Sequence, residues 1–391
     1  MKLSRRIAWS VLPAALAASC LALPATTALA VPSAQASPDS TPVPAGFVAQ
    51  STSWISPSQG WVLGTEICGK VSNCTTSQVI GTTNGGATWS QIGPLNAQIP
   101  KMGQAGTGTI TEISFASASI GWGFGPGLYH TANGGKTWQT EKIPGGGKQV
   151  LDLAVTKTAA YLIASPCAYA TGICGSKPLT TWRTTVASTT WTKMPVTLHA
   201  NVNADVSASG NAVYLVNQRL DGPDNPSQLY VSTNGGTSFR ARHVPCGSQS
   251  EFNLVQAAAY SATGVGFLCD GDPGFGKAVK TVYLSDNNGK TDASAGTMGQ
   301  YGIQAELAIS PSRNLAVESW SIGSFIYIND NHGKKWYMII GSGDGGAGFN
   351  DITYVSGREA WVVYGPADGF SGYGQIYKTA NSGRKWQLVN F

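Results

Sequence analysis

One eight-residue phrase recurs along the chain and constrains its fold more than any other feature. It reads Thr-Thr-Asn-Gly-Gly-Ala-Thr-Trp at residues 82–89, and further copies occupy residues 131–138, 232–239, 285–292, 329–336 and 379–386. A degenerate copy at 184–191 keeps only the first threonine and the final Thr-Trp. Measured at the last position, the spacings are 49, 53, 48, 53, 44 and 50 residues. A nearly constant period in this range is typical of repeat architectures, so seven copies predict seven structural units.

Each unit contains the same succession of short segments, most clearly the second. Residues 110–115, 120–124, 127–130 and 137–143 alternate apolar and polar side chains and are separated by Gly, Asn and Ser. Period-two alternation with aromatic and β-branched residues indicates short antiparallel strands. Four strands in each of seven units predict an all-β fold, a seven-bladed β-propeller that spans residues 46–391.

The phrase falls between the third and fourth predicted strands of each unit. A tight hairpin there needs residues that tolerate positive φ, which Asn and Gly do. We expect the Ser or Thr two places before the Asn to lock the turn by hydrogen bonds, and the closing Trp to fill the space between blades. The six recognisable copies share a structural Asn at the third position: Asn84, Asn133, Asn234, Asn287, Asn331 and Asn381.

The N-terminus has the pattern of a secretory signal peptide. A basic start precedes an apolar run over residues 7–23, and Ala28-Leu29-Ala30 is a suitable cleavage site, with a second one ending at Ala36. We therefore expect residues 1–30 to be a signal peptide and the protein to be secreted. Cys20 leaves a lipid anchor as an alternative.

Composition narrows the classes of partner. Residues 31–45 are rich in Pro, Ser and Ala and predict a disordered linker, and no later segment reaches 18 apolar residues, so no membrane span is expected. The net charge of +5 comes without a Lys/Arg cluster, which argues against nucleic-acid binding. We expect a monomer without a cofactor or a metal site.

Six cysteines remain after the predicted cleavage, an even number in an exported chain, which favours disulfides. A Cys-ligated metal is the alternative, but no C-x-x-C spacing occurs. Proximity in the sequence suggests three pairs: Cys68–Cys74, Cys167–Cys174 and Cys246–Cys269.

The phrase resembles the Asp-box, or BNR repeat, Ser/Thr-x-Asp-x-Gly-x-Thr-Trp, which sialidases, sortilin-type receptors, xyloglucan-cleaving enzymes and photosystem II stability/assembly factors share. The resemblance extends over about residues 47–391, with Asn in place of Asp. The succession 113–115 (Ile-Ser-Phe) and 120–122 (Ile-Gly-Trp) is most similar to the photosystem-factor branch. In this superfamily the Asp-box turn is structural, so the resemblance implies a fold and leaves the function open.

Strand direction assigns the loops to two faces. The turns that carry the phrase share one face, called the bottom face here, while the loops between second and third strands and between blades share the opposite, top face. All six cysteines fall in top-face segments. Four aromatic residues of these loops could stack on a sugar or cap a peptide, or could simply pack on their own blades: Tyr169, Phe275, Phe370 and Tyr373.

An acidic residue is predicted near the start of the innermost strand in five of the seven units: Glu112, Asp152, Asp205, Glu306 and Asp351. Ser51 and Ala257 occupy this place in the other two units. One interpretation is structural, with each carboxylate accepting backbone N–H groups of the next blade. The other is a funnel that attracts a cation or a basic group, in which crowding raises the carboxyl pKa values.

Catalysis is not the leading prediction. Sialidase activity needs an arginine triad and an early Arg-Ile-Pro element, whereas no arginine of the mature chain precedes Arg183, and sialidases have six blades. A glycan-processing hydrolase or lyase remains an alternative, with a carboxylate pair such as Asp152 and Asp205. We predict a secreted, non-catalytic propeller that binds a protein, peptide or glycan ligand through its top face. An assembly factor for an exported or membrane complex is the second alternative.

Overall fold

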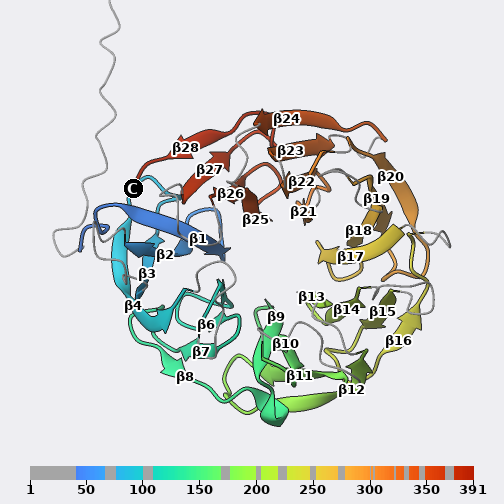
Figure 1. The fold of residues 1–391 in the computed structure, drawn as a ribbon, viewed down its shortest axis with the longest axis horizontal. Coiled ribbons are helices and arrows are strands. Elements are labelled where there is room, and N and C mark those ends of the chain that lie inside the picture. Colours follow the sequence, from blue (N-terminus) through green and yellow to red (C-terminus); the bar gives the residue numbers. More distant parts are fainter. Residues whose placement is uncertain are drawn as a thin grey trace, which may run out of the picture. The chain divides into compact units, whose positions relative to one another are not determined.

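Seven four-stranded antiparallel sheets follow one another along the chain and surround a common axis (Figure 1). The computed structural model describes residues 41–66, 76–99, 109–168, 177–199, 204–218, 227–246, 252–271, 278–299, 301–302, 304–320, 323–329, 334–342, 348–365 and 374–391. These residues belong to one unit, Ala36–Phe391. The predicted seven-bladed β-propeller is confirmed.

Blades 1 to 4 consist of consecutive strands. They are β1 (Phe47–Trp54), β2 (Gly60–Glu66), β3 (Thr76–Thr82), β4 (Ser90–Gln98), β5 (Glu112–Phe115), β6 (Gly121–Phe124), β7 (Leu128–Thr131), β8 (Gln139–Thr140), β9 (Gln149–Val155), β10 (Ala159–Ser165), β11 (Leu179–Thr185), β12 (Thr192–Leu198), β13 (Ala204–Ser209), β14 (Ala212–Asn217), β15 (Gln228–Ser232) and β16 (Arg240–Arg242). A short 3-10 turn, Pro144–Gly146, links blades 2 and 3.

Blades 5 to 7 repeat the arrangement. Their strands are β17 (Phe252–Ala259), β18 (Val265–Gly271), β19 (Lys280–Ser285), β20 (Ala293–Thr297), β21 (Gln304–Ile309), β22 (Leu315–Trp320), β23 (Ser324–Asn329), β24 (Tyr337–Ser342), β25 (Phe349–Tyr354), β26 (Ala360–Tyr364), β27 (Gln375–Thr379) and β28 (Gln387–Val389). The first strand of each blade lies innermost and the fourth outermost (Figure 1).

The second unit shows where the predicted boundaries were wrong. Three of its strands lie within two residues of the expected ranges, but the fourth, expected over 137–143, is only Gln139–Thr140. Its continuation runs instead into the 3-10 turn at Pro144, because proline cannot donate a ladder hydrogen bond.

The repeated phrase forms the turn between third and fourth strands, as expected. In blade 2 the Thr131 hydroxyl donates to Asn133 Oδ1 (3.0 Å) and accepts from the Gly135 N–H (3.0 Å). Asn133 Oδ1 also accepts from the Thr137 N–H (2.9 Å), and Asn133 Nδ2 donates to Thr137 Oγ1 (2.8 Å). The side-chain amide thus bridges both ends of the turn. The same set of bonds occurs around Asn84, Asn234 and Asn287.

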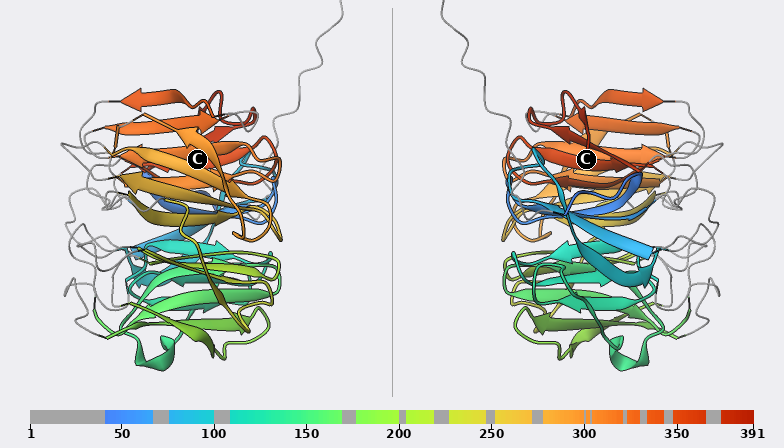
Figure 2. Two further views of the ribbon diagram at one scale, coloured as in Figure 1. Left: turned by 90° about the vertical axis from the view of Figure 1, so that its right-hand side faces the viewer. Right: turned by 90° about the vertical axis from the view of Figure 1, so that its left-hand side faces the viewer.

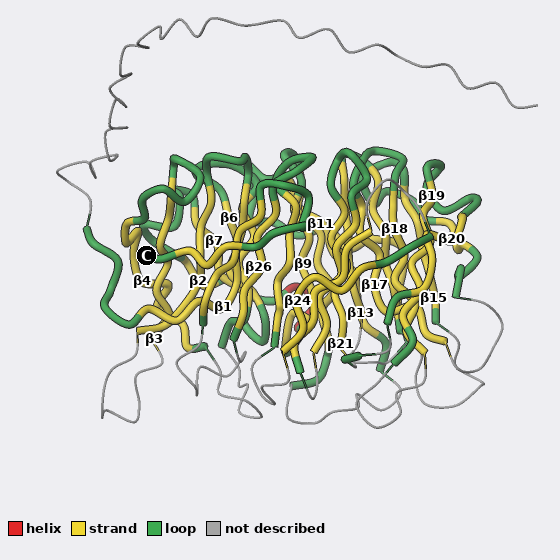
Figure 3. Tube along the Cα trace, turned by 90° about the horizontal axis from the view of Figure 1, so that it is seen from above, coloured by secondary structure: helices red, strands yellow, loops and turns green. Residues whose placement is uncertain are grey.

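These turns also join neighbouring blades. The carbonyl oxygen of the first glycine in the phrase accepts a bond from a side chain of the preceding blade: Gly134 from Trp61 Nε1 (3.0 Å), Gly235 from Arg183 (2.8 Å) and Gly85 from Lys378 Nζ (2.9 Å). The turns lie together at one end of the strands, which is the bottom face (Figures 2 and 3).

The ring closes without exchange of a strand, because blade 1 contains only the first four strands and blade 7 only the last four. Side chains hold this seam instead. Trp54 stacks on Trp361 with ring centroids 4.1 Å apart, Trp89 meets both rings edge-on, and Lys378 Nζ lies 4.9 Å from the Trp361 ring centroid. Similar apolar clusters fill the spaces between the other blades.

Candidate functional site

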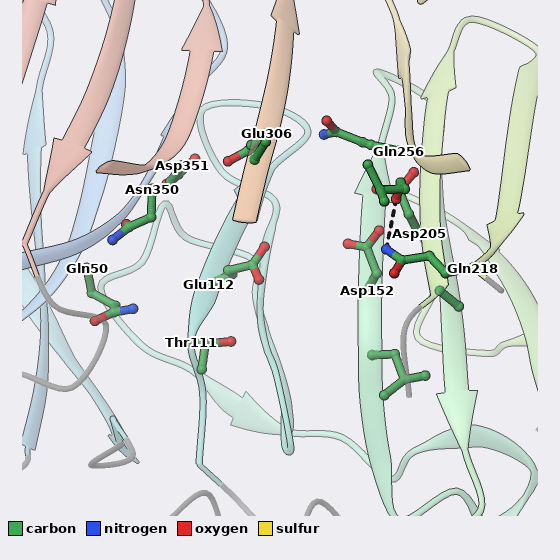
Figure 4. A pocket seen from close by; sticks show the side chains of 14 residues that line it. Gln50, Thr111, Glu112, Asp152, Asp205, Gln218, Gln256, Glu306, Asn350 and Asp351 are labelled. Atoms are coloured by element: carbon green, nitrogen blue, oxygen red, sulfur yellow. Dashed lines mark hydrogen bonds between the residues drawn. The ribbon is translucent and has the colours of Figure 1, made fainter. Parts of the chain in front are cut away.

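The main candidate site is a cavity of about 500 Å³ at the propeller axis, lined by the innermost strands (Figure 4). All five predicted carboxyls line it: Glu112, Asp152, Asp205, Glu306 and Asp351. Side-chain amides and a hydroxyl complete the polar lining: Gln50, Gln218, Gln256, Asn350 and Thr111. None of the described residues that line the cavity is cationic.

Four of the five carboxyls make the hydrogen bonds that the structural interpretation requires. Each has one oxygen that accepts a backbone N–H from the following blade. The pairs are Asp152 with Val206 (2.6 Å), Asp205 with Ala257 (3.2 Å), Glu306 with Ile352 (3.3 Å) and Asp351 with Thr52. Ser51 makes the corresponding bond to the Ile113 N–H (3.3 Å). These contacts bind successive blades together, and they fix the positions of the four carboxyls.

Glu112 is the exception. Among the described residues it makes no hydrogen bond through its carboxyl, and the Leu153 N–H, which would be its partner by analogy, donates to Asp152 Oδ1 (2.7 Å) instead. Its side chain lines the cavity and is exposed there. Among the described residues, Glu112 is therefore the ring carboxyl that does not hydrogen-bond to the next blade.

The assignment of Ala257 to the ring was wrong. Gln256 occupies this place in blade 5, and its Oε1 accepts the Leu307 N–H (2.6 Å) as the acids do elsewhere. Ala257 is buried and donates its N–H to Asp205. Gln256 pairs with Leu268 as Ser51 pairs with Leu63, but the glycine–aromatic pair on which the blades were aligned lies one residue further along β18 than along β2.

Bulges recur at the cavity wall. The pairing of β1 shifts beside Gln50, that of β9 beside Leu151, and that of β25 around Asp351. Asp351 has a φ of 53°, in the left-handed region that costs a non-glycine residue about 1 kcal/mol or more. An extra residue changes the direction of its neighbours, so in β9 and β25 two consecutive residues line the cavity, Leu151 with Asp152 and Asn350 with Asp351.

Burial raises the pKa of every carboxyl in the ring. It raises the pKa of Asp152 and of Asp351 to about 6, and burial followed by the charge of Asp351 raises that of Glu306 to about 8. For Asp205, burial and then the Asp152 charge raise the pKa well above its usual value. For Glu112, burial comes first and the charges of the other four acids follow. The ring therefore carries bound protons near neutral pH, because close carboxyls resist simultaneous ionisation.

A sixth acid, on the second strand of blade 6 next to the ring, was not predicted. Glu318 of β22 pairs across the sheet with Glu306 and is only 3% exposed, and its Oε2 has no hydrogen-bond partner among the described residues. Burial and then the charge of Glu306 raise the pKa of Glu318 well above its usual value. A sequence signal existed, since a lone Glu interrupts the apolar run of this strand.

Several predicted features fall outside the described residues. They are the loop aromatics Tyr169, Phe275, Phe370 and Tyr373, the Cys68–Cys74 pair, Cys174, Asn331, and residues 1–40 with the predicted signal peptide and Cys20. The expected disulfide between Cys246 and Cys269 is present, and Cys167 is also disulfide-bonded. No helix within the described ranges has the length and hydropathy that a membrane crossing requires.

Comparisons with known proteins give matches among solved structures. No family model and no curated protein matches the sequence. Solved structures with a similar fold include YCF48 from Cyanidioschyzon merolae (TM-score 0.46, 16% identity, 71% of this chain and 85% of that chain). A structure of YCF48 bound to D1 peptide matches with a TM-score of 0.44 and 14% identity over 72% of this chain and 80% of that chain. The GH74 enzyme of Niastella koreensis matches with a TM-score of 0.31 and 12% identity over 87% of this chain and 71% of that chain.

Proposed function

We propose that this protein is an exported, non-catalytic binding propeller whose axial cavity receives a basic group of a protein or peptide ligand. The observation that carries the proposal is the lining of the cavity, in which five carboxyls converge and no described residue supplies a positive charge. Like charges focused in a cleft attract a cation of opposite sign. The volume of about 500 Å³ lies within the range of ligand sites and suits a lysine or arginine side chain.

The hydrogen bonds distinguish the carboxyls that hold the blades together from the carboxyl that is available to a ligand. Asp152, Glu306 and Asp351 each accept a backbone N–H of the neighbouring blade through one oxygen, so their positions are fixed before any ligand binds. Both oxygens of Glu112, which bond to no described residue, can accept from a guanidinium or ammonium group, and bonds to a charged donor are the stronger ones. Preorganised acceptors reduce the entropy cost of binding.

The test is a binding measurement with short arginine- or lysine-containing peptides, acidic peptides and neutral oligosaccharides on the purified protein. We expect the basic peptides to bind, more tightly at pH 8 than at pH 5 because the ring carboxyls ionise over this range, and less tightly at high salt. Glu112→Gln should weaken binding about tenfold, since one charged hydrogen bond is worth about 1.5 kcal/mol or more. Asp292→Asn, a change of the same charge on the exposed bottom face, should leave the affinity unchanged.

A glycan-processing hydrolase is the second candidate, favoured by one observation. The pKa values of Asp152 and Glu306, about 6 and about 8, would suit a base and an acid facing one cavity. Release of reducing ends from a plant or bacterial polysaccharide, abolished by Glu306→Gln, would replace the binding proposal by this one.

An assembly factor for an exported or membrane complex would instead use the same cavity to hold a basic segment of a client subunit. Failure of every basic peptide to bind would refute the binding proposal.

A further inference from the structure

The bottom face has an uneven distribution of charge. In blades 1 and 4, its described turns and loops carry no charged residue, and in blades 2 and 3 they carry one lysine each, Lys136 and Lys157. In blade 5, Lys290 is outnumbered by Asp286 and Asp292. The cations of this face therefore gather on blades 6 and 7.

A cation of the blade 6 loop, Arg313, is ion-paired with Asp286 of blade 5 (3.1 Å). The other five cationic side chains form a cluster that we call the basic rim: Lys334, Lys335, Arg358, Arg384 and Lys385. All five are exposed. The acid of the described turns in these two blades, Glu359, is already ion-paired with Lys378 (Nζ to Oε1, 2.8 Å). Asp330 is outside the described residues, and even when its charge is counted against these five cations a positive excess remains.

Topology places the members of the rim on one face. The loop between first and second strands and the turn between third and fourth strands emerge at the same end of each blade, and backbone bonds join them, as from the Ser382 N–H to the Arg358 carbonyl oxygen (2.8 Å). Blades 6 and 7 are neighbours in the ring (Figure 1).

Exposed apolar side chains adjoin the basic rim. Among the described residues, the large hydrophobic side chains that face solvent are few, and three of them lie on the outermost strands of these two blades: Tyr337 (42% exposed), Met338 (51%) and Leu388 (45%). Tyr337 and Met338 begin β24 directly after the turn, and Lys335 Nζ lies 5.1 Å from the Tyr337 ring centroid. Basic and apolar side chains are thus presented together at one edge.

We propose that the bottom edge of blades 6 and 7 is a docking surface for a lipid bilayer that contains anionic phospholipid. Lysine and arginine side chains beside an anionic surface attract it, and tyrosine, methionine and leucine gain free energy when they enter the interface. A soluble polyanion would satisfy the cations but would leave Met338 and Leu388 in water. The axial carboxyls lie towards the other end of the blades, so docking in this way keeps the acidic cavity away from the negative membrane. This inference does not depend on the proposed function.

The experiment is co-sedimentation of the full protein with vesicles of phosphatidylcholine alone and with vesicles that contain 30 mol% phosphatidylglycerol. We expect binding to the anionic vesicles only, lost at high salt. Because each basic residue near such a surface contributes about 1 kcal/mol, a factor of roughly five, Lys334→Gln/Lys335→Gln should lower the partition coefficient roughly 25-fold. The separate variant Met338→Ser/Leu388→Ser should also lower the partition coefficient, although it does not change the charge.

Two controls decide the interpretation. Lys136→Gln/Lys157→Gln removes the same charge from the same face on blades 2 and 3 and should change vesicle binding little. Dextran sulfate tests a soluble polyanion. The proposal is overturned if anionic vesicles do not bind, if the two double-lysine variants lose binding equally, or if dextran sulfate competes fully while Met338→Ser/Leu388→Ser has no effect on vesicles.

Discussion

The seam between blades 1 and 7 offers the sharpest test of how this ring is held together. Trp361 is fully buried there, stacked on Trp54 and contacted by the Lys378 ammonium group. A buried tryptophan removes about 200 Å² from water, which at about 25 cal/mol per Å² is worth about 5 kcal/mol as an upper limit. We therefore expect Trp361→Ala to lower the free energy of unfolding by about 4 kcal/mol, within the usual range for such truncations.

A matched variant separates loss of burial from opening of the ring. Trp122 is equally buried, but it lies between blades 2 and 3, which the chain itself connects. Trp122→Ala should therefore cost a similar free energy in urea unfolding. Blades 1 and 7 have no such connection, because no strand is exchanged between them. We expect Trp361→Ala alone to accelerate amide hydrogen exchange throughout β1–β4 and β25–β28.

Hydrogen-exchange mass spectrometry of both variants and the wild type is the assay. Equal exchange patterns in the two variants would refute the idea that the seam is the weak point of the ring. Unchanged protection of blades 1 and 7 in Trp361→Ala would show that the backbone bond from Thr52 to Asp351 and the remaining contacts suffice to close it.

Further predictions concern pH, the disulfide, the turns and a buried lysine. Because folding raises the pKa of Glu306 to about 8, the protonated form is favoured in the folded state; stability from this group is complete below about pH 4 and is lost as the pH rises through 8, so the unfolding temperature should fall over that range, and less so in Glu306→Gln. Replacing Cys246 and Cys269 by serine should cost about 3 kcal/mol, measured by urea unfolding, as their loop spans 23 residues. Asn133→Ala should cost about 1–2 kcal/mol in the same assay and Asn133→Asp less, because aspartate keeps the acceptor oxygen for the Thr137 N–H. Lys280, fully buried, donates to three carbonyl oxygens, so Lys280→Met should lower the unfolding temperature by several degrees, whereas a neutral change in thermal melting would contradict this role.

The linear sequence determined the architecture of this protein, since the period of the phrase specifies seven units and the alternation of side chains specifies strands. It also located Asn133 and its equivalents in turns, and it placed the acids of the innermost strands around one axis. These features are local or periodic, and periodicity can be read without knowledge of distant contacts.

The tertiary structure alone decided what the ring contains and how it is held. The glycine–aromatic pair of β18 lies one residue further along its strand than that of β2, so Gln256 rather than Ala257 faces the axis, and only the strand pairing shows this. The absence of a visible hydrogen bond at Glu112 depends on the position of the next blade, about 40 residues along the chain. The stacked pair of Trp54 and Trp361 likewise joins the first and the last blade of the chain. Such contacts arise when separate segments pack against one another, and a sequence lists its residues without the distances between them.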